Sequence, residues 1–225
     1  MLQRVLVWAV SSLFFLSLSA QDCLRYYPQE TDGSFEIMTY NKKDKVESRA
    51  VYQVVERSDN QITYEATLYD KKDKEVTTMT FAIYCEGDVL KVDMRNFMPA
   101  NTLEQMNMEG VDVDMESTDM AFPANLTVGQ SLPDADISIK VTLNGMPMLT
   151  TTSETTNRKV IAKESITTPM GTYECFVITG DFFAKMGFVK VQTSEKLFLH
   201  PEKGFLRSES YDKKGKLESY TVRTS

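Results

Sequence analysis

A short string that occurs three times constrains the fold of this chain more than any other feature. It reads Tyr-Asn-Lys-Lys-Asp-Lys at 40–45, Tyr-Asp-Lys-Lys-Asp-Lys at 69–74 and Tyr-Asp-Lys-Lys-Gly-Lys at 211–216. The second residue of each copy can accept hydrogen bonds from its own turn backbone, and the fifth suits a left-handed backbone conformation. Each copy therefore predicts the tip of a β-hairpin. The copies are unequally spaced, which does not support a propeller or a solenoid, since these need a fixed period.

Between the turns, apolar and polar residues alternate, as in strands with one wet face. The clearest runs are 62–68, 136–143 and 189–199, and Glu195 is the one charged residue on the apolar side of the last run. Further strands are predicted at 34–40, 46–56, 75–85, 88–94, 148–156, 158–167, 172–179, 205–211 and 217–223. The pattern predicts an all-β fold, an antiparallel and highly curved sheet that forms a half-barrel or a flattened barrel, with a sandwich as the remaining alternative.

One stretch, residues 96–108, breaks the alternation. It has a proline near its start, is followed closely by a glycine, and carries the apolar residues Phe97, Met106 and Met108. This composition indicates one short helix or loop that crosses an end of the sheet, where it would plug the mouth of a barrel.

The first twenty residues have the pattern of a signal peptide. Arg4 precedes an apolar run at 5–18, and Ser19 and Ala20 offer a cleavage site with small residues. The run is shorter than the ~20 residues that a spanning helix needs. We therefore expect residues 1–20 to be removed, leaving no transmembrane span in the mature chain. Residues 21–225 are expected to form a single antiparallel β domain that is exported to the periplasm, the cell surface or the medium.

The charge of the chain argues against nucleic acid as a partner. The formal net charge is −7, and many of the lysines lie at the predicted hairpin tips. Such a chain has no continuous basic stripe that could follow a phosphate backbone.

Three cysteines, Cys23, Cys85 and Cys175, allow at most one internal disulfide. Cys175 alternates with apolar neighbours on one side of its strand, where a free cysteine packs as a small apolar residue. Cys85 ends a strand at the rim of the sheet, which an N-terminal segment can reach. The pattern favours a Cys23–Cys85 disulfide, while a Cys85–Cys175 disulfide and no disulfide stay open. The absence of a Cys-x-x-Cys motif gives no support to thioredoxin-like redox chemistry or a zinc finger.

Residues with catalytic or metal-binding potential are few. His200 is the only histidine and precedes a proline in a predicted turn, so we assign no catalytic residue and do not expect an enzyme. Six methionines and six acids lie between 94 and 120, without a Met-x-x-Met array or the glycine and terminal glutamate of a calcium loop. We interpret them as core methionines beside solvated acids, and expect neither a metal nor a cofactor.

Three segments resemble a known family. Residues 168–178, TPMGTYECFVI, resemble the signature P-x-G-T-aromatic-x-C-aromatic-x-I of the exported domain-of-unknown-function family 3108 and its TapB-like relatives from Gram-negative bacteria. Residues 199–209, LHPEKGFLRSE, are similar to its return strand, and residues 123–132, PANLTVGQSL, to a further segment. The resemblance implies an extracytoplasmic antiparallel half-barrel or barrel with no established activity. Because these motifs are structural, no functional residue is carried over.

Three classes of function differ in what the inside of the sheet must contain. A lipocalin-like module would enclose an apolar cavity, an envelope scaffold or assembly factor would fill its core and expose an apolar or edge-strand surface, and an enzyme would gather polar groups in a cleft. We expect a non-enzymatic binding or interaction domain for an unknown apolar small molecule or, as the alternative, an envelope protein; a hydrolase is less favoured. The predicted ligand-binding residues are Phe81, Ile83, Phe97, Met106, Met108 and Val177.

Overall fold

The computed structural model describes residues 23–26, 34–93 and 111–225. Within these ranges the chain forms thirteen β-strands and one 3-10 turn, and no α-helix. In chain order the elements are η1 (Cys23–Tyr26), β1 (Phe35–Asn41), β2 (Val46–Arg57), β3 (Gln61–Asp70), β4 (Glu75–Glu86), β5 (Val89–Val92), β6 (Val111–Thr118), β7 (Met120–Pro123), β8 (Ala135–Leu143), β9 (Met146–Thr168), β10 (Gly171–Met186), β11 (Val189–His200), β12 (Gly204–Tyr211) and β13 (Leu217–Arg223).

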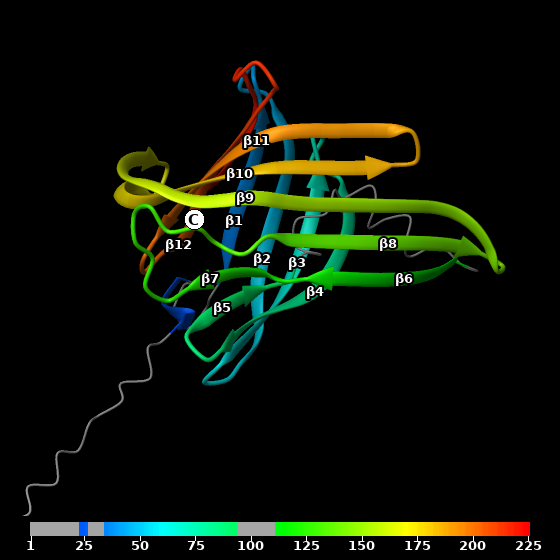
Figure 1. Cartoon of the computed structure of the whole chain (residues 1–225), viewed down its shortest axis with the longest axis horizontal. Helices are drawn as coiled ribbons and strands as arrows, with labels where there is room; N and C mark the ends of the chain where they lie inside the picture. The colour runs from blue at the N-terminus through cyan, green and yellow to red at the C-terminus, as the bar shows by residue number, and fades with distance from the viewer. Residues whose placement is uncertain (1–22, 27–33, 94–110) are drawn as a thin grey trace, which may run out of the picture.

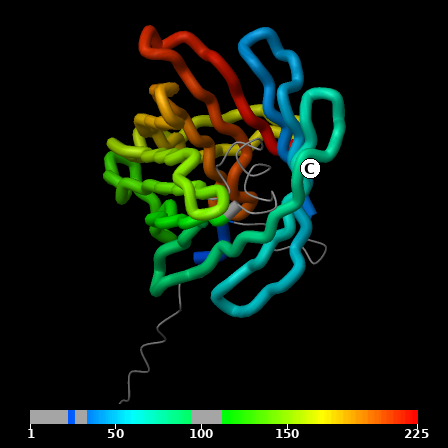
Figure 2. The backbone as a smooth tube through the Cα atoms, turned by 90° about the vertical axis from the view of Figure 1, so that its right-hand side faces the viewer, coloured from blue at the N-terminus to red at the C-terminus, as the bar shows by residue number. Residues whose placement is uncertain are grey.

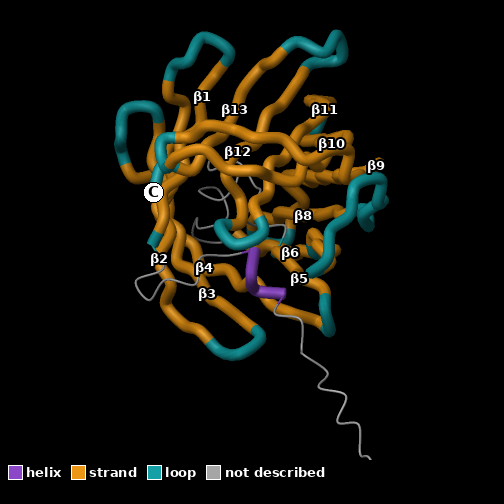
Figure 3. Tube along the Cα trace, turned by 90° about the vertical axis from the view of Figure 1, so that its left-hand side faces the viewer, coloured by secondary structure: helices purple, strands orange, loops and turns teal. Residues whose placement is uncertain are grey.

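All thirteen strands belong to one antiparallel sheet that almost closes into a barrel (Figures 2 and 3). Its spatial order is β6-β8-β9-β10-β11-β12-β13-β1-β2-β3-β4-β5-β7. Only Asp119 separates β6 from β7 in the chain, although these strands are the two edges of the sheet. The barrel therefore has one unsealed seam, at which the chain itself passes from one edge to the other. The predicted all-β, highly curved antiparallel sheet is confirmed.

The repeated string forms the tips of the hairpins β1–β2, β3–β4 and β12–β13. The second residue of each copy accepts a hydrogen bond from the backbone N–H two residues on, at 2.9 Å for Asn41, 2.8 Å for Asp70 and 2.7 Å for Asp212. The fifth residue has a positive φ in each copy, 56° at Asp44, 61° at Asp73 and 72° at Gly215. The hairpin tips predicted from the string are thus confirmed, together with their turn chemistry.

The main core lies on the concave side of the sheet and draws on almost every strand. Its aromatic centre joins β1, β2, β3 and β4: Phe35 stacks on Tyr52 with ring centroids 4.5 Å apart, and Tyr64 stacks on Phe81 at 5.8 Å. Such offset pairs add to the area that they bury. The aromatic side chains therefore pack β1, β2, β3 and β4, which belong to two successive hairpins, against one another.

A second, smaller core lies on the opposite face of β10, β11 and β12. It is formed by Cys175, Val177, Phe198 and Leu206, all buried. Phe176 and Ile178 belong to the main core, and successive residues of a strand point to opposite faces. Val177 therefore does not line the same interior as Phe81, as the sequence led us to expect, because its position in the strand turns it to the other side.

Three elements differ from the predictions. The strands expected at 148–156 and 158–167 are one strand, β9, of 23 residues, and a bulge at its middle replaces the expected break. The strands β6 and β7 were not predicted, since the acids of β6 were interpreted as solvated residues beside a loop. The predicted crossing at 96–108 lies outside the described residues, and so does the predicted signal peptide.

Unequal strand lengths produce a projection that we call the arm. β9 has 23 residues and β10 has 16, whereas β12 has 8 and reaches β11 only from Ser194 to His200. Among the described strands, residues 189–193 of β11 therefore pair with β10 alone. The hairpins β8–β9 and β10–β11 run side by side away from the barrel (Figure 1). We call their ends, residues 143–148 and 185–190, the arm tip.

Candidate functional site

The residues predicted to bind a ligand do not form one site. Phe81 and Ile83 are buried on β4 in the main core, and the ring of Phe81 packs against Tyr64. Their side chains are thus engaged in core packing. Val177 lies in the second core on the other face. Phe97, Met106 and Met108 lie outside the described residues.

The structure contains a disulfide between Cys23 and Cys85, the pairing that the sequence favoured. It joins η1 to β4, with 6.0 Å between the Cα atoms. Tyr26 fixes the other end of η1, because its hydroxyl donates to the carbonyl oxygen of Ala124 at 2.7 Å. Cys175 is free and buried, and burial raises the pKa of its thiol to about 11. A thiol of this kind is inert at neutral pH.

His200 caps the turn between β11 and β12. Its Nδ1 accepts hydrogen bonds from the backbone N–H groups of Glu202 and Lys203, both at 3.1 Å. The ring also meets Tyr173 edge to face, with centroids 5.4 Å apart, and burial lowers the pKa of the imidazole. These contacts indicate that His200 stabilises the turn, since its Nδ1 already accepts two backbone hydrogen bonds.

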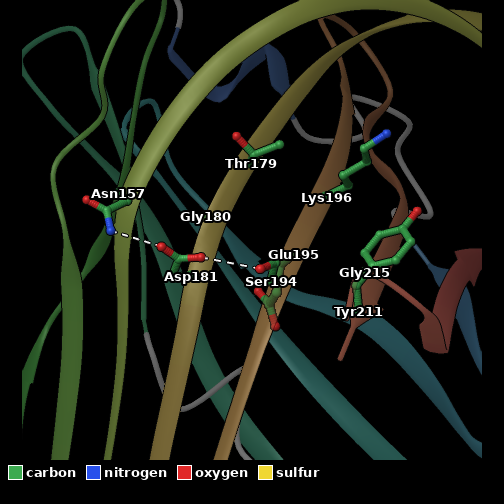
Figure 4. A pocket seen from close by; sticks show the side chains of 9 residues that line it. All are labelled: Asn157, Thr179, Gly180, Asp181, Ser194, Glu195, Lys196, Tyr211 and Gly215. Atoms are coloured by element: carbon green, nitrogen blue, oxygen red, sulfur yellow. Dashed lines mark hydrogen bonds between the residues drawn. The ribbon is translucent and has the colours of Figure 1, made fainter. Parts of the chain in front are cut away.

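An open hollow of about 420 Å³ lies between β9 and the β12–β13 hairpin (Figure 4). Asp181 accepts hydrogen bonds there from Asn157 Nδ2 at 2.9 Å and from Ser194 Oγ at 3.4 Å. Thr179, Lys196 and Tyr211 also line the hollow. Both oxygens of Asp181 thus tie neighbouring strands together, and the single histidine of the chain lies elsewhere, in the β11–β12 turn. The hollow has no base–nucleophile pair of the histidine type.

Neither a metal site nor a membrane-spanning helix emerges from the described part of the chain. In residues 23–26, 34–93 and 111–225, no group of three or more His, Cys, Asp or Glu side chains is arranged to hold a metal ion. Over the same ranges, no helix has the length and apolar character needed to cross a membrane. Of the methionines near the acidic run, Met120 is buried and Met115 packs against the main core, which agrees with their interpretation as core residues.

Arg158 links β9 to β7, one of the two strands at the unsealed seam, and its role was not predicted. It lies at the bulge of β9, is buried, and donates from Nη1 to the carbonyl oxygens of Ala121 on β7 at 3.2 Å and of Pro133 at 2.7 Å. Its guanidinium lies 4.8 Å from the ring centroid of Phe122, and burial lowers its pKa to about 10. Gly180 leaves room for it, since a Cβ there would lie 3.3 Å from Arg158 Cγ. The residues before Arg158 in the sequence are polar, so the local pattern does not indicate that Arg158 is buried.

Glu195 is a second ionisable group on the core side of the sheet. It pairs with Gly180 on β10 and with Ser210 on β12, and it alternates with Leu197, which packs against the main core. Burial raises the pKa of its carboxyl group to about 7. The one charged residue on the apolar side of its predicted strand is therefore a half-buried carboxyl group, and its partial burial disfavours the ionised form.

The arm tip carries large apolar side chains that are exposed. Phe188 is fully exposed, Met146 is 68% exposed, Met148 62% and Val189 57%. The two hairpin ends are neighbours but are offset along the arm. Met186 pairs with Val189 within β10–β11 and with Thr151 of β9, and the β10–β11 turn lies beside Leu149, so the β8–β9 turn extends further. The β8–β9 turn is tight, with positive φ at both Asn144 and Gly145, so it presents the methionines at the extreme end of the hairpin. Large exposed apolar side chains that gather on one projection are typical of interaction sites in soluble proteins.

The arm tip is also basic. Lys185 and Lys190 are directly paired across β10 and β11, and residues 143–148 and 185–190 contain no acid. The nearest acid on the adjoining strand β6 is the exposed Asp112, which pairs with Thr142, one residue before the tip. The whole chain, in contrast, has a net charge of −7. The charge of the arm tip thus has the opposite sign to that of the protein as a whole. The hydrophobic pattern of the sequence did mark the valines of β11 as apolar, but as core residues, so the arm tip was not predicted.

Comparison with known proteins identifies the family. The family model described as DUF3108-like matches residues 31–222. A structure described as that of an exported protein with a YmcC-like fold, from Bacteroides fragilis, is similar with a TM-score of 0.71 and 18% identity, over 88% of this chain and 96% of that one. A structure described as that of a lipoprotein from Parabacteroides distasonis has a TM-score of 0.72 and 21% identity, over 89% and 97%. At these identities the two likenesses show the fold. No curated protein matched. The family match over most of its length shows that the chain belongs to the DUF3108-like family.

Proposed function

We propose that this protein is a non-enzymatic, exported interaction domain that binds an apolar partner through the arm tip. The observation that carries the proposal is the exposure of Phe188, Met146 and Met148, which lie near the ends of two hairpins that project together from the barrel. Burial of large apolar side chains in a contact is the main source of binding free energy in most interfaces. A partner that covers the arm tip would therefore gain affinity by burying these apolar side chains, which lower the solubility of the free protein while they are exposed.

Export is supported by three observations. Residues 1–20 have the charge, apolar run and small-residue exit of a signal peptide. The two structural neighbours are described as an exported protein and a lipoprotein. The disulfide between Cys23 and Cys85 suits an oxidising compartment outside the cytoplasm.

A contact surface accounts for the exposed residues better than an enclosed ligand does. A lipocalin-like module would keep its apolar side chains for the inside of the barrel, yet Phe81 and Ile83 pack into the main core while Phe188 points into water. The non-enzymatic part of the proposal is supported by His200, whose Nδ1 is engaged in a turn, and by Asp181, whose oxygens hold strands together.

Site-specific photo-crosslinking in the native host tests the proposal. A photoreactive residue replaces Phe188 in one variant and Val128 in the other; Val128 is 56% exposed in the β7–β8 connection. We expect crosslinked products, to lipid or to protein, from position 188 and not from position 128. Equal yields at the two positions, or no product at 188, would contradict the proposal. A parallel screen with hydrolase substrates that found turnover lost in His200→Ala would replace it with an enzymatic function.

A further inference from the structure

We infer that the partner of the arm tip is a lipid bilayer surface with anionic headgroups. The inference rests on the proposed function and names the occupant of that surface. Three features of the arm tip carry it: its position at the end of a projection, its apolar side chains and its paired lysines.

The shape of the arm suits shallow insertion. The hairpins β8–β9 and β10–β11 project together from the barrel, and the β8–β9 end extends further than the β10–β11 end (Figure 1). Phe188 follows the turn glycine of one hairpin, and Met146 and Met148 follow the turn of the other, at the start of β9. Phenylalanine and methionine at such ends can enter the boundary between headgroups and acyl chains while the paired backbone stays hydrogen-bonded within the sheet.

The two lysines of the arm tip indicate that the lipid surface it contacts is negatively charged. Lys185 and Lys190 face each other directly across β10 and β11, and like charges in that position destabilise a sheet. Both are exposed, and the ion pairs found in the described residues include neither of them. Headgroup phosphates that lie between two such lysines would remove the repulsion and add attraction. The apolar residues and the lysines therefore favour the same occupant.

A second copy of the chain fits the arm tip less well. Two arm tips in contact would bring four lysines together, because each contributes the pair Lys185 and Lys190. This arrangement would add the like-charge repulsion that a bilayer removes. A self-associated state is therefore an outcome that the test has to distinguish, and it is not the expected one.

Vesicle co-sedimentation of the purified, oxidised protein tests the inference. The probe is a mixture of about three parts phosphatidylcholine to one part phosphatidylglycerol, compared with phosphatidylcholine alone. We expect the protein to bind the anionic vesicles and to be released as the salt concentration rises. Phe188→Asp should weaken this binding by about tenfold or more, since a phenylalanine that the bilayer would bury is replaced by a charge of the same sign as the lipid. Val128→Asp, at an equally exposed valine in the β7–β8 connection, is the matched control and should bind as the parent does.

A second variant keeps the test independent of Phe188. In Lys185→Gln/Lys190→Gln the apolar residues are intact, and binding to anionic vesicles should fall by about thirtyfold, while binding to neutral vesicles should be unchanged. Circular dichroism and the urea midpoint of each variant check that the fold is retained.

The outcomes separate the inference from the proposed function. Failure of the parent protein to bind anionic vesicles, with crosslinks from position 188 to a protein, would overturn the inference and leave the proposed function in place. Failure of both experiments would overturn both. Concentration-dependent self-association in analytical ultracentrifugation that Phe188→Asp abolishes would assign the arm tip to a second copy and overturn the inference.

Discussion

Replacement of Glu195 by glutamine should make the protein more stable at alkaline pH and leave it unchanged in mild acid. The side chain lies on the core side of β11, and burial raises the pKa of its carboxyl group from 4.5 to about 7. Glutamine keeps the size and much of the hydrogen-bonding capacity of the protonated acid but never ionises. The variant therefore isolates the free energy of placing a charge at this position.

The magnitude follows from the two pKa values. Between about pH 4.5 and pH 7 the folded state keeps a proton that the unfolded state has lost, so the free energy of unfolding falls as the pH rises through this window. Above about pH 7 the loss is complete. The full difference corresponds to about 3 kcal/mol. Since the side chain of Glu195 is only partly shielded from water, we expect about 2 kcal/mol.

Urea unfolding of the oxidised protein measures the effect. At about pH 8, Glu195→Gln should exceed the parent in free energy of unfolding by about 2 kcal/mol, and at about pH 4.5 the two should agree. Glu154→Gln, at an exposed carboxylate on β9, is the control and should show no such pH dependence. A difference between Glu195→Gln and the parent that is the same at both pH values would refute the reasoning, because it would not arise from ionisation.

Further predictions concern the disulfide, the seam and the free cysteine. Reduction of Cys23–Cys85, whose sequence separation is 62, should lower the free energy of unfolding by about 4 kcal/mol in urea titrations with and without reductant. Gly180→Ala should destabilise the protein by about 1 to 2 kcal/mol, because its Cβ would lie 3.3 Å from Arg158 Cγ and from the carbonyl oxygen of Thr156. An unchanged melting temperature would contradict that packing. Cys175, buried and with its pKa raised to about 11, should react with a thiol reagent at neutral pH only when the protein is unfolded; rapid labelling of the native protein would contradict its burial.

Local chemistry made the hairpins and most strands predictable. In the three repeated strings, Asn41, Asp70 and Asp212 bond to backbone groups only two residues away. These turns can therefore be predicted from the local sequence alone. Strand alternation depends only on a period of two, and the bounds of β1, β2, β3 and β8 fall within two residues of those expected. The family resemblance implies an antiparallel half-barrel or barrel, which agrees with the curved antiparallel sheet predicted from strand alternation.

Features that depend on distant parts of the chain were not predictable. The burial of Arg158 depends on Ala121 and Pro133, which only the closing of the sheet brings to it. Val177 and Phe176 are both apolar, and alternation alone does not say which face of β10 turns to the larger core. Val189 and Val191 lie beyond the end of β12, where β11 pairs with β10 alone, and they are exposed although their alternation is that of core residues. The arm tip thus follows from a mismatch of strand lengths, which no local pattern records.

A tryptophan reporter at the arm tip tests the central claim most directly. The only tryptophan of the chain, Trp8, lies in the predicted signal peptide, so in protein purified after export Phe188→Trp or Val128→Trp would introduce the sole indole. With vesicles that contain phosphatidylglycerol, we predict a blue shift of emission, and quenching by brominated lipid, for Phe188→Trp and not for Val128→Trp. An emission spectrum of Phe188→Trp that stays unchanged, or a shift of equal size in Val128→Trp, would contradict the claim that the arm tip is the surface that meets the lipid.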